Sequence, residues 1–509
     1  MSYLLGIDVG TTGAKALLVN EKGDIVARSS HEYPLHTPRP GWAEQDPADW
    51  WQATANAIRD VAGAPGIRAA EIAGMGLSGQ MHGSVFLDAQ NEVIRPAILW
   101  CDQRTADQCD WITRAAGRET VVAETCNPVL TGFTAPKIVW LKQQEPQAYA
   151  RVRKVLLPKD YIRFRLTGEF ATEVSDASGT SLLNIRQRKW SKKMLAALEL
   201  PEDWLPPVFE SPIPSATISA EASRLTGLPA GMPVVGGGGD QAAGAVGNGI
   251  VTSGVVSVTC GTSGVVFASL DSPVMDEQLR THTFCHAVPG KWHVMGVMLS
   301  AGGSLRWYRD ALASEEVALA RRMGVDPYEL ITAQAATVEP GCEGLVFLPY
   351  LTGERTPYPD PDARGVFLGL NLRSGRAQMA RAILEGVAYG LRDSLEIVKE
   401  MGVKITQVRA SGGGARSSLW RQIQADVFNT ELVTITVDEG PAFGVALLAG
   451  VGAGMFKTVE EACEKTIRLK DRTQPATANV ATYELFYRIY RSLYPALKPL
   501  FADLSKAVC

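Results

Sequence analysis

Short apolar runs separated by polar turns open the chain. Tyr3–Ile7, Ala16–Val19 and Ile25–Ala27 are runs of this kind, and Asn20–Asp24 has the composition of a hairpin turn. We therefore predict a three-stranded antiparallel meander at the N-terminus. Trp50–Val61 follows with apolar residues at helical spacing, which predicts a helix.

The turn after the first strand occurs twice in the chain. Asp8–Gly13 recurs as Thr259–Gly264, almost half the chain away, and the second copy also lies between apolar runs, Val255–Val258 and Val265–Phe267. Self-similarity at this distance predicts two related halves, each containing a strand, a glycine- and hydroxyl-rich turn, and a strand. The first copy begins with Asp8 and the second with a threonine, so only the first offers a carboxylate to a metal ion.

Two further strands end in polar residues. Ile72–Leu77 leads into Ser78–Gly83, and Ile98–Trp100 leads into Cys101–Arg104. Because functional side chains concentrate on loops at strand ends, we expect these two segments to share a pocket.

Two glycine runs join strands to helices. Pro233–Val235 enters Gly236–Gly239 and then Asp240, which would lie near a helix N-terminus, where the positive end of the dipole favours a carboxylate. An N-cap aspartate is the alternative interpretation. Val408–Ser411 enters Gly412–Gly414, which suits a nucleotide base or ribose lying on the turn; a crowded helix entry is the alternative.

The C-terminal half contains further predicted elements. They are a strand at Leu345–Pro349, a long helix at Met379–Glu400, a helix at Ser417–Phe428, and an amphipathic helix at Ala481–Leu500 whose aromatic residues we expect in the core. Gln241–Leu270 carries no formal charge, but its many glycines favour a buried helix and two buried strands over a membrane span.

Length and composition bound the class of protein. A chain of 509 residues is too long for one core, and together with the repeat this predicts two domains, 1–245 and 246–509. A net charge of −4 gives no reason to expect a nucleic-acid partner. Eight scattered cysteines without a CxxC pair indicate reduced thiols. Because Asp8 interrupts the first apolar run, no secretory signal is expected, and we predict a cytoplasmic protein without a membrane partner. A homodimer is one assembly that the sequence permits.

Both glycine- and hydroxyl-rich turns suit phosphate binding. Glycine lets a backbone N–H approach a phosphate closely, and threonine hydroxyls add donors. A single turn of this composition could equally be an ordinary hairpin. Two copies at matching positions are stronger evidence. The chain has no GxxxxGK[ST] run, so a P-loop is not predicted.

Longer motifs place the chain near a known family. Gly132–Leu141 resembles the first signature of the FGGY carbohydrate kinases, and Gly365–Leu370, continued by Gln378 and Ala382–Gly386, resembles the second. The resemblance covers essentially the whole chain. It implies an α/β fold of two duplicated ribonuclease-H-like, actin-like ATPase domains with a central cleft, the N-terminal domain binding sugar and the C-terminal domain binding nucleotide.

Other segments resemble one branch of that family, the members that phosphorylate the ketopentose D-xylulose. These segments are Trp42–Pro47, Gly79–Gly83, Leu156–Tyr161, Ser175–Thr180 and Leu351–Pro357. Glycerol-phosphorylating members usually carry an Arg-Glu pair a few residues after the Gly-Gln. Here Gly83, Ser84 and Val85 occupy that stretch, which argues against glycerol.

The resemblance implies transfer of the ATP γ-phosphoryl group to the 5-hydroxyl of D-xylulose, with Mg²⁺. Asp240 would be the general base and would contact the sugar, and Asp8 would anchor Mg²⁺, partly through water. The turn residues Gly10, Thr11 and Thr12 would face the transferring phosphate, and Gly261 and Thr262 would hold the ADP phosphates.

The remaining implied contacts divide between sugar and nucleotide. Sugar contacts fall on Met81 and His82, with Gln80, Trp100, Asp102 and Arg104 as further candidates, and adenine-nucleotide contacts fall on Gly302, Arg306, Gly414 and Ser418. At Arg306 and Ser418 the side chain differs from that of the glycerol kinases. Two alternatives stay open at this point: a kinase for another ketose, such as ribulose or a hexulose, and a non-catalytic scaffold of the actin fold.

Overall fold

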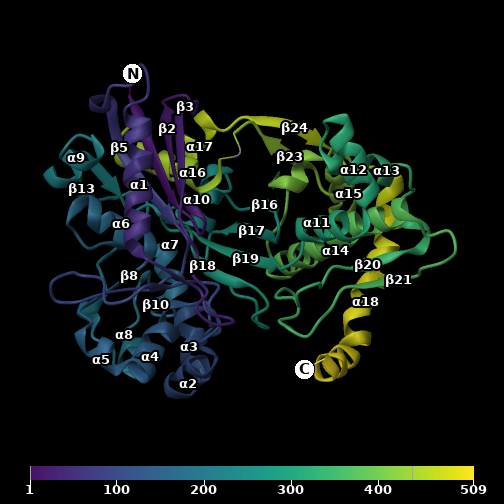
Figure 1. The fold of residues 1–509 in the computed structure, drawn as a ribbon, viewed down its shortest axis with the longest axis horizontal. Helices are drawn as coiled ribbons and strands as arrows, with labels where there is room; N and C mark the ends of the chain where they lie inside the picture. The colour runs from purple at the N-terminus through teal and green to yellow at the C-terminus, as the bar shows by residue number, and fades with distance from the viewer. Residues whose placement is uncertain (1, 438, 509) are drawn as a thin grey trace.

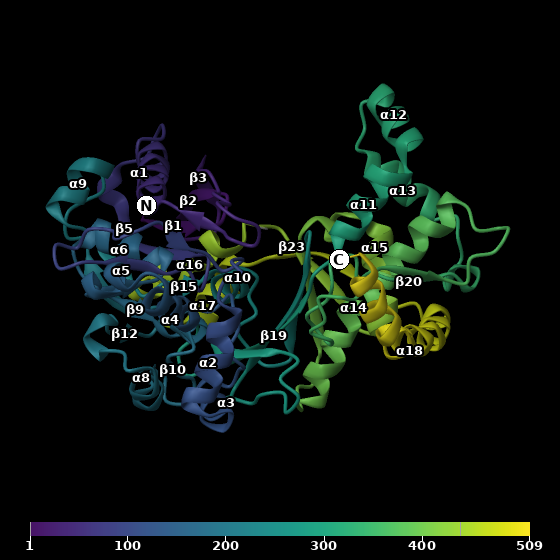
Figure 2. The same ribbon diagram turned by 60° about the horizontal axis from the view of Figure 1, so that its bottom comes forward.

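The computed structural model describes residues 2–437 and 439–508, and two seven-stranded sheets form its centre (Figures 1 and 2). The first sheet has the order β13-β14-β5-β1-β2-β3, with β15 beside β5. Its strands are β1 (Tyr3–Val9), β2 (Gly13–Asn20), β3 (Ile25–Glu32), β5 (Ile72–Gly79), β13 (Pro214–Thr217), β14 (Pro233–Val235) and β15 (Gly238–Gly239). The second has the order β18-β19-β17-β16-β22-β23-β24, formed by β16 (Val255–Cys260), β17 (Gly264–Leu270), β18 (His282–Cys285), β19 (Trp292–Met298), β22 (Gln407–Ser411), β23 (Leu432–Ile435) and β24 (Leu469–Thr473).

The two sheets share one topology. In the first, β1, β2 and β3 form an antiparallel meander, and β1 and β14 both run parallel to β5. In the second, β16, β17 and β19 form the meander, and β16 and β23 run parallel to β22. The duplication predicted from the repeated turn is confirmed strand by strand.

Helices cover both sheets. In the first half they are α1 (Pro47–Ala62), α2 (Ala106–Ala116), α3 (Arg118–Thr125), α4 (Thr134–Gln144), α5 (Pro146–Arg151), α6 (Pro158–Thr167), α7 (Val174–Ala177), α8 (Lys192–Leu198), α9 (Ala220–Thr226) and α10 (Asp240–Gly247). In the second they are α11 (Gly302–Leu312), α12 (Ser314–Met323), α13 (Pro327–Ala335), α14 (Arg376–Glu400), α15 (Ser418–Phe428), α16 (Gly440–Gly452), α17 (Val459–Thr466) and α18 (Thr477–Val508).

Small two-stranded sheets complete the fold. Their strands are β4 (Glu44–Gln45), β6 (Val85–Leu87), β7 (Ala97–Ile98), β8 (Lys154–Leu156), β9 (Thr172–Glu173), β10 (Leu183–Asn184), β11 (Lys189–Trp190), β12 (Val208–Phe209), β20 (Val346–Leu348) and β21 (Val366–Leu368). The predicted strand at Leu345–Pro349 is therefore present as β20, but it pairs with β21 and lies outside the large sheet. The strand predicted at Ile98–Trp100 is short as well: β7 pairs with β4, and Ile98 makes one isolated bridge with Ser84.

The predicted helices are present. Trp50–Val61 lies in α1, Met379–Glu400 in α14, Ser417–Phe428 in α15 apart from its first residue, and Ala481–Leu500 in α18. Tyr483, Tyr487 and Tyr490 of α18 are buried and Phe486 packs against the same core, so the aromatic residues of this helix serve packing.

Two helices bind the halves together. α10, which follows the first sheet, packs against α16 from the second half, and α16 also packs on β1 and β5 (Figure 1). The helices approach closely because both are rich in glycine: a Cβ on Gly247 would lie 3.1 Å from the amide nitrogen of Gly444. The division at residue 245 stays a prediction.

The uncharged stretch at Gln241–Leu270 forms α10, β16 and β17, as predicted. No helix in the described part of the chain is long and apolar enough to cross a membrane. Seven of the cysteines are free thiols, and Cys509 lies outside the described residues.

Candidate active site

Register across the first sheet brings the two candidate carboxylates to one edge. Asp8 lies opposite Ser78 of β5, and Ser78 lies opposite Gly238 of β15 on its other side. α10 begins at Asp240, directly after β15. Parallel strands end at the same edge of a sheet, so Asp8 and Asp240 converge there.

The pKa values of both carboxyl groups are raised. Burial, and then the charge of Asp8, raise the pKa of Asp240 to about 7, against hydrogen bonds from Gln241. Burial also raises the pKa of Asp8, against the smaller lowering effects of the nearby Ser78 hydroxyl and of the charge of Lys15. Oδ1 of Asp8 is buried and has no hydrogen-bond partner among the described residues. Two carboxylates in this arrangement favour a bound cation or a shared proton.

The first turn is held in shape by Gln80, Trp100 and Tyr33. The amide nitrogen of Gly10 donates to the carbonyl of Gly13 at 3.0 Å, and the carbonyl of Gly10 accepts from the Tyr33 hydroxyl and from Nε2 of Gln80. Thr11 Oγ1 donates to Oε1 of Gln80 at 3.3 Å and accepts from Nε1 of Trp100 at 3.0 Å. The structure thus brings Gln80 and Trp100 to the first turn, while the side chain of Thr12 is exposed, and a sugar contact from Gln80 or Trp100 stays a prediction.

Met81 and His82 follow Gln80, and Met81 lies against Gly239, the residue before Asp240. A Cβ on Gly239 would meet the side chain of Met81 at 2.9 Å, so the glycine before Asp240 is required for this contact. The ring of His82 stacks on Phe133 with 4.7 Å between centroids, and its Nδ1 lies 2.8 Å from the carbonyl of Gly179. Burial, then the charge of Lys137, lowers the pKa of His82 to about 3, so the ring is neutral.

Neutrality fixes the tautomer of His82. A carbonyl oxygen only accepts, so Nδ1 carries the proton and donates to Gly179. Nε2 is therefore an acceptor. This is the arrangement needed to receive a hydrogen bond from a hydroxyl group.

Asp102 and Arg104 are engaged with each other and with Glu44. Nη2 of Arg104 lies 2.7 Å from Oδ2 of Asp102, and its Nη1 lies 2.7 Å from Oε1 of Glu44. The guanidinium also lies over the ring of Trp42 at 3.6 Å. Asp102 accepts from the amide of Ala43 as well. Both predicted side chains thus serve the packing of this loop in the structure, and a sugar contact from either of them stays a prediction.

A fully buried ionic cluster supports the site from below, and sequence reasoning missed it. Nζ of Lys159 lies 2.7 Å from Asp160, 3.3 Å from Asp176 and 3.6 Å from Glu173, with every side chain inaccessible to solvent. Oε1 of Glu173 also accepts a hydrogen bond at 3.2 Å from the amide of Gly239, the residue directly before α10. The cluster could not be predicted from local sequence patterns, because Lys159 meets Glu173 and Asp176 only through tertiary contacts.

Lys159→Met is expected to lower the free energy of unfolding by about 3–5 kcal/mol at neutral pH, because it removes the cation nearest to three buried carboxylates and leaves them with Arg163, whose Nε lies 4.0 Å from Asp160. Burial alone would lower the pKa of Lys159, but the charges of Asp160, Asp176 and Glu173 outweigh it and raise the pKa. The stabilisation is therefore complete at neutral pH and is lost only as pH rises through that raised value. Urea unfolding at pH 7 measures the loss.

Lys142→Met is the matched control for this prediction. Lys142 makes an ion pair with Glu199 at the surface, at 2.8 Å, and its loss is expected to cost about 0–1 kcal/mol. Equally small losses of unfolding free energy in the two variants would show that the buried cluster does not stabilise the fold.

The second turn lines a cavity of about 680 Å³ in the second half. Its geometry repeats that of the first turn: the amide nitrogen of Gly261 donates to the carbonyl of Ser263 at 3.0 Å, and the side chain of Thr262 is exposed. The start of α11 is held to this turn, because the amides of Gly302 and Gly303 donate to the carbonyls of Gly261 and Thr262. A volume of this size accommodates a nucleotide.

Predicted nucleotide residues meet at this cavity. Gly261, Thr262, Gly302, Arg306 and Gly414 line it, whereas Ser417 lines it in place of Ser418. Ser417 is the N-cap of α15 and accepts from the amide of Trp420. The cavity is also lined by α13 and its N-cap, through residues that the sequence did not predict: Asp326, Tyr328, Glu329 and Thr332. The Asp326-Pro327 start of α13 signals a helix but nothing about a ligand.

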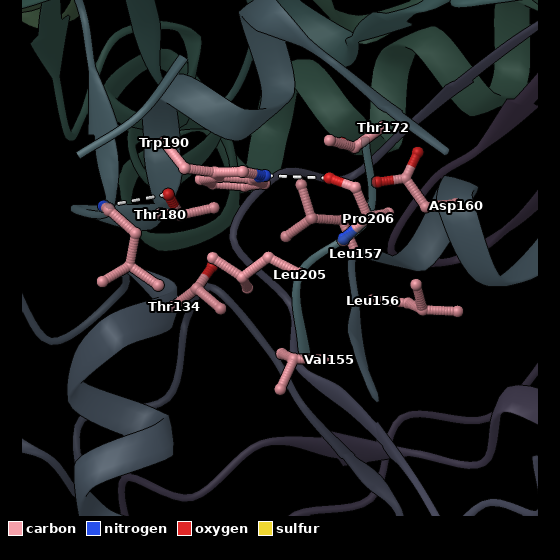
Figure 3. Close-up of a pocket in the computed structure, with 11 residues that line it drawn as sticks. Thr134, Val155, Leu156, Leu157, Asp160, Thr172, Thr180, Trp190, Leu205 and Pro206 are labelled. Carbon is pink, nitrogen blue, oxygen red and sulfur yellow. Dashed lines mark hydrogen bonds between the residues drawn. The ribbon is translucent and has the colours of Figure 1, made fainter. Parts of the chain in front are cut away.

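A much smaller cavity lies in the first half, away from these residues (Figure 3). It measures about 10 Å³, is lined mainly by apolar side chains, and is bordered by Trp190, whose Nε1 donates to the carbonyl of Pro206 at 2.8 Å. That is room for a water molecule at most. The nucleotide-sized cavity is therefore the one at the second turn.

Comparison with known proteins gives this arrangement its context. Residues 3–247 match the model of the FGGY family of carbohydrate kinases, N-terminal domain, and residues 256–453 match that of the C-terminal domain. The chain belongs to the FGGY family of carbohydrate kinases. It is therefore an enzyme that phosphorylates a carbohydrate, with ATP as the phosphoryl donor that the family implies, and the scaffold alternative is set aside.

Relatives of this FGGY kinase match it over nearly its whole length. Xylulose kinase from Escherichia coli (strain K12) is 41% identical over 499 residues, covering 98% of this chain and 100% of that protein. Gluconokinase from Bacillus subtilis (strain 168) is 32% identical over 506 residues, covering 99% of this chain and 98% of that protein. A crystal structure of a xylulose kinase from Brucella ovis superimposes with a TM-score of 0.89 at 39% identity, over 98% of this chain and 100% of that one. The predicted fold class and family are confirmed.

Proposed function

We propose that this FGGY kinase transfers the γ-phosphoryl group of ATP to the 5-hydroxyl of D-xylulose. The observation that carries the proposal is the convergence of Asp240, Asp8 and the Met81-His82 loop at one edge of the first sheet. Full-length similarity to xylulose kinases supports this choice of sugar. A cytoplasmic location stays a prediction.

Asp240 is the proposed general base. Its carboxylate lies at the start of α10, at the edge of the sheet where β1 ends and the first turn begins. In its ionised form it accepts the proton of the attacking hydroxyl as the oxygen–phosphorus bond forms, and the bond from the γ-phosphorus to the bridging oxygen breaks to leave ADP. A pKa raised to about 7 makes this carboxylate a stronger base than an exposed aspartate.

The residues at this edge fit a magnesium ion. The buried, unpartnered Oδ1 of Asp8 is a hard oxygen donor of the kind that Mg²⁺ prefers. Within the described residues no three His, Cys, Asp or Glu side chains are grouped to hold a metal, so the remaining ligands would be phosphate oxygens and water. When bound, the ion would neutralise charge on the transferring phosphate.

The sugar contacts follow from the side chains beside Asp240. Nε2 of His82 accepts a hydrogen bond from a sugar hydroxyl, and Met81 presents an apolar surface to the carbon chain. The two turns divide the phosphates, with Gly10, Thr11 and Thr12 toward the transferring group and Gly261 and Thr262 toward ADP. Closure of the two halves around sugar would exclude water, the competing acceptor.

A panel of acceptors in an ADP-release assay tests the choice of sugar. The panel contains D-xylulose, D-ribulose, a hexulose, gluconate and glycerol, each measured as kcat/KM at saturating ATP. We expect the highest value with D-xylulose. A higher value with gluconate or with another ketose would overturn the proposed substrate and leave the family assignment intact.

A further inference from the structure

Strand β18 of the second half lies against the loop of the first half that carries Met81 and His82. Phe284 of β18 has its ring centroid 6.3 Å from that of His82 and 5.9 Å from that of Phe133, and His282 lies 6.0 Å from Phe133. Met295 of β19 packs in the same apolar cluster as Met81. The second half therefore contributes a wall beside the proposed sugar-binding residues.

Polar contacts fix this wall in place. Nδ2 of Asn127 donates to the carbonyl of Thr283 at 2.8 Å, and the amide of Thr283 donates to Oδ1 of Asn127 at 3.1 Å. The amide of Cys285 donates to Oγ of Ser178 at 3.0 Å. The thiol of Cys285 also donates to the carbonyl of Ile185 at 3.5 Å, so four hydrogen bonds join β18 to the first half while it pairs with β19 in the second sheet.

The loop that carries Arg355 is tied to β19 on both sides of that residue. Oε1 of Glu354 accepts from the amides of Leu299 at 2.9 Å and Arg355 at 2.7 Å. The amide of Thr356 donates to the carbonyl of Val297 at 3.0 Å, and its Oγ1 accepts from the amide of Val297 at 3.1 Å. The backbone of Arg355 therefore has a fixed position beside β19, the strand that pairs with β18.

Within the described part of the chain, the guanidinium of Arg355 has no hydrogen-bond or ion-pair partner. The residue is half-buried, and its side chain makes no hydrogen bond or ion pair with any residue from 2 to 437 or 439 to 508. Its charge also lowers the pKa of His282, second to burial, and makes a smaller contribution, behind burial and the charge of Lys137, to lowering the pKa of His82. Removing a charged group from water without a partner is costly, and a ligand's oxygen atoms would offset that cost.

We propose that Arg355 is a substrate-binding residue supplied by the second half, whose guanidinium donates hydrogen bonds to a hydroxyl oxygen of the sugar held by Met81 and His82. The inference rests on the proposed function, because it assumes that the sugar lies at His82. It adds a specificity-determining contact from the opposite half.

The placement also connects sugar to nucleotide. Glu354 holds the amide of Leu299, and three residues later Gly302 donates its amide to Gly261 of the second turn at 2.7 Å. Ser300 and Thr352 add a hydroxyl contact of 3.1 Å between the same two segments. The loop that carries Arg355 is therefore joined through a few hydrogen bonds to the segment that holds the second turn.

Arg355→Met tests the contact by removing the charge and the donors while keeping a long side chain. We expect the KM for D-xylulose to rise about 10- to 100-fold, the range for loss of a hydrogen bond to a charged group. Arg355→Lys, which keeps the charge, should recover part of the loss. The matched control is Arg373→Met: Arg373 is exposed, pairs with Glu343 at the surface, and should leave the KM unchanged.

Monodeoxy analogues of the sugar separate a contact from a purely structural role. In the wild-type enzyme, removing the hydroxyl that Arg355 binds lowers kcat/KM; in Arg355→Met that one analogue should lose its penalty while the others keep theirs. A uniform loss for all analogues, or an unchanged sugar KM, overturns the inference. If the wild-type enzyme prefers another acceptor of the panel, the proposed substrate fails, and the deoxy analogues of that acceptor decide the role of Arg355.

Discussion

Asp240→Asn is expected to lower kcat by about 10²- to 10⁴-fold, the usual contribution of a general base. An amide cannot accept the proton of the attacking hydroxyl, so the step that forms the oxygen–phosphorus bond loses its acceptor. The amide keeps the size of the carboxylate and its ability to hydrogen bond, so sugar binding should persist. Steady-state kinetics and calorimetric sugar titration measure the two effects separately.

The structure rules out the N-cap interpretation of Asp240, because Gly239 is the N-cap of α10 and Asp240 is the first residue of the helix. A carboxylate in the first turn still interacts favourably with the helix dipole, by about 0.3–1 kcal/mol, and loss of that interaction would lower stability without lowering turnover. Asp46→Asn is the matched control, because Asp46 is the N-cap of α1 and accepts from the amide of Ala48. Both variants should unfold at the wild-type temperature, and near-normal turnover by Asp240→Asn would refute the assignment of the base.

Asp8→Asn is expected to lower kcat by about 10²-fold or more and to weaken the dependence of the rate on Mg²⁺. The reason is that metal assistance is worth several kcal/mol and each 1.36 kcal/mol is tenfold in rate. The fold should tolerate the change, because it removes a buried charge that has an unpartnered oxygen. Magnesium titrations of the rate, with thermal unfolding as the check on folding, provide the measurement.

A second readout of Asp8→Asn uses metal-free enzyme. Burial is the larger cause of the raised pKa of Asp240 and the charge of Asp8 is the next, so the variant should titrate Asp240 at a lower pH than the wild-type value of about 7. Carboxyl-carbon NMR follows this titration. An unchanged pKa together with an unchanged magnesium requirement would show that the two aspartates do not share a site.

The repeated turn predicted more of this molecule than any other sequence feature. It predicted the strand–turn–strand unit of each half and the difference between the halves, which now has a structural form. Where Asp8 lies opposite Ser78 in the first sheet, Thr259 lies opposite Ser411 in the second, and their hydroxyl oxygens are 2.9 Å apart. A neutral hydroxyl pair thus occupies the position at which the first half carries its carboxylate.

Features that depend on distant contacts escaped prediction. The uniform hydrophobicity of α16 says that the helix is buried, but not that it packs on the first sheet. The contacts of Arg104 with Glu44 and Trp42 could not be predicted from the sequence, and a sugar contact from Arg104 or Asp102 stays a prediction. The contact of Asn127 with β18 joins residues far apart in the chain, and local periodicity carries no signal for it.

The most direct test of the account is the structure of the reaction product. D-Xylulose and ATP are incubated with the enzyme and Mg²⁺, and phosphorus and carbon NMR locate the new phosphate ester. We predict D-xylulose 5-phosphate, formed in equal amount with ADP. Phosphate on a different hydroxyl, or unconsumed D-xylulose under conditions in which gluconate is phosphorylated, would contradict it.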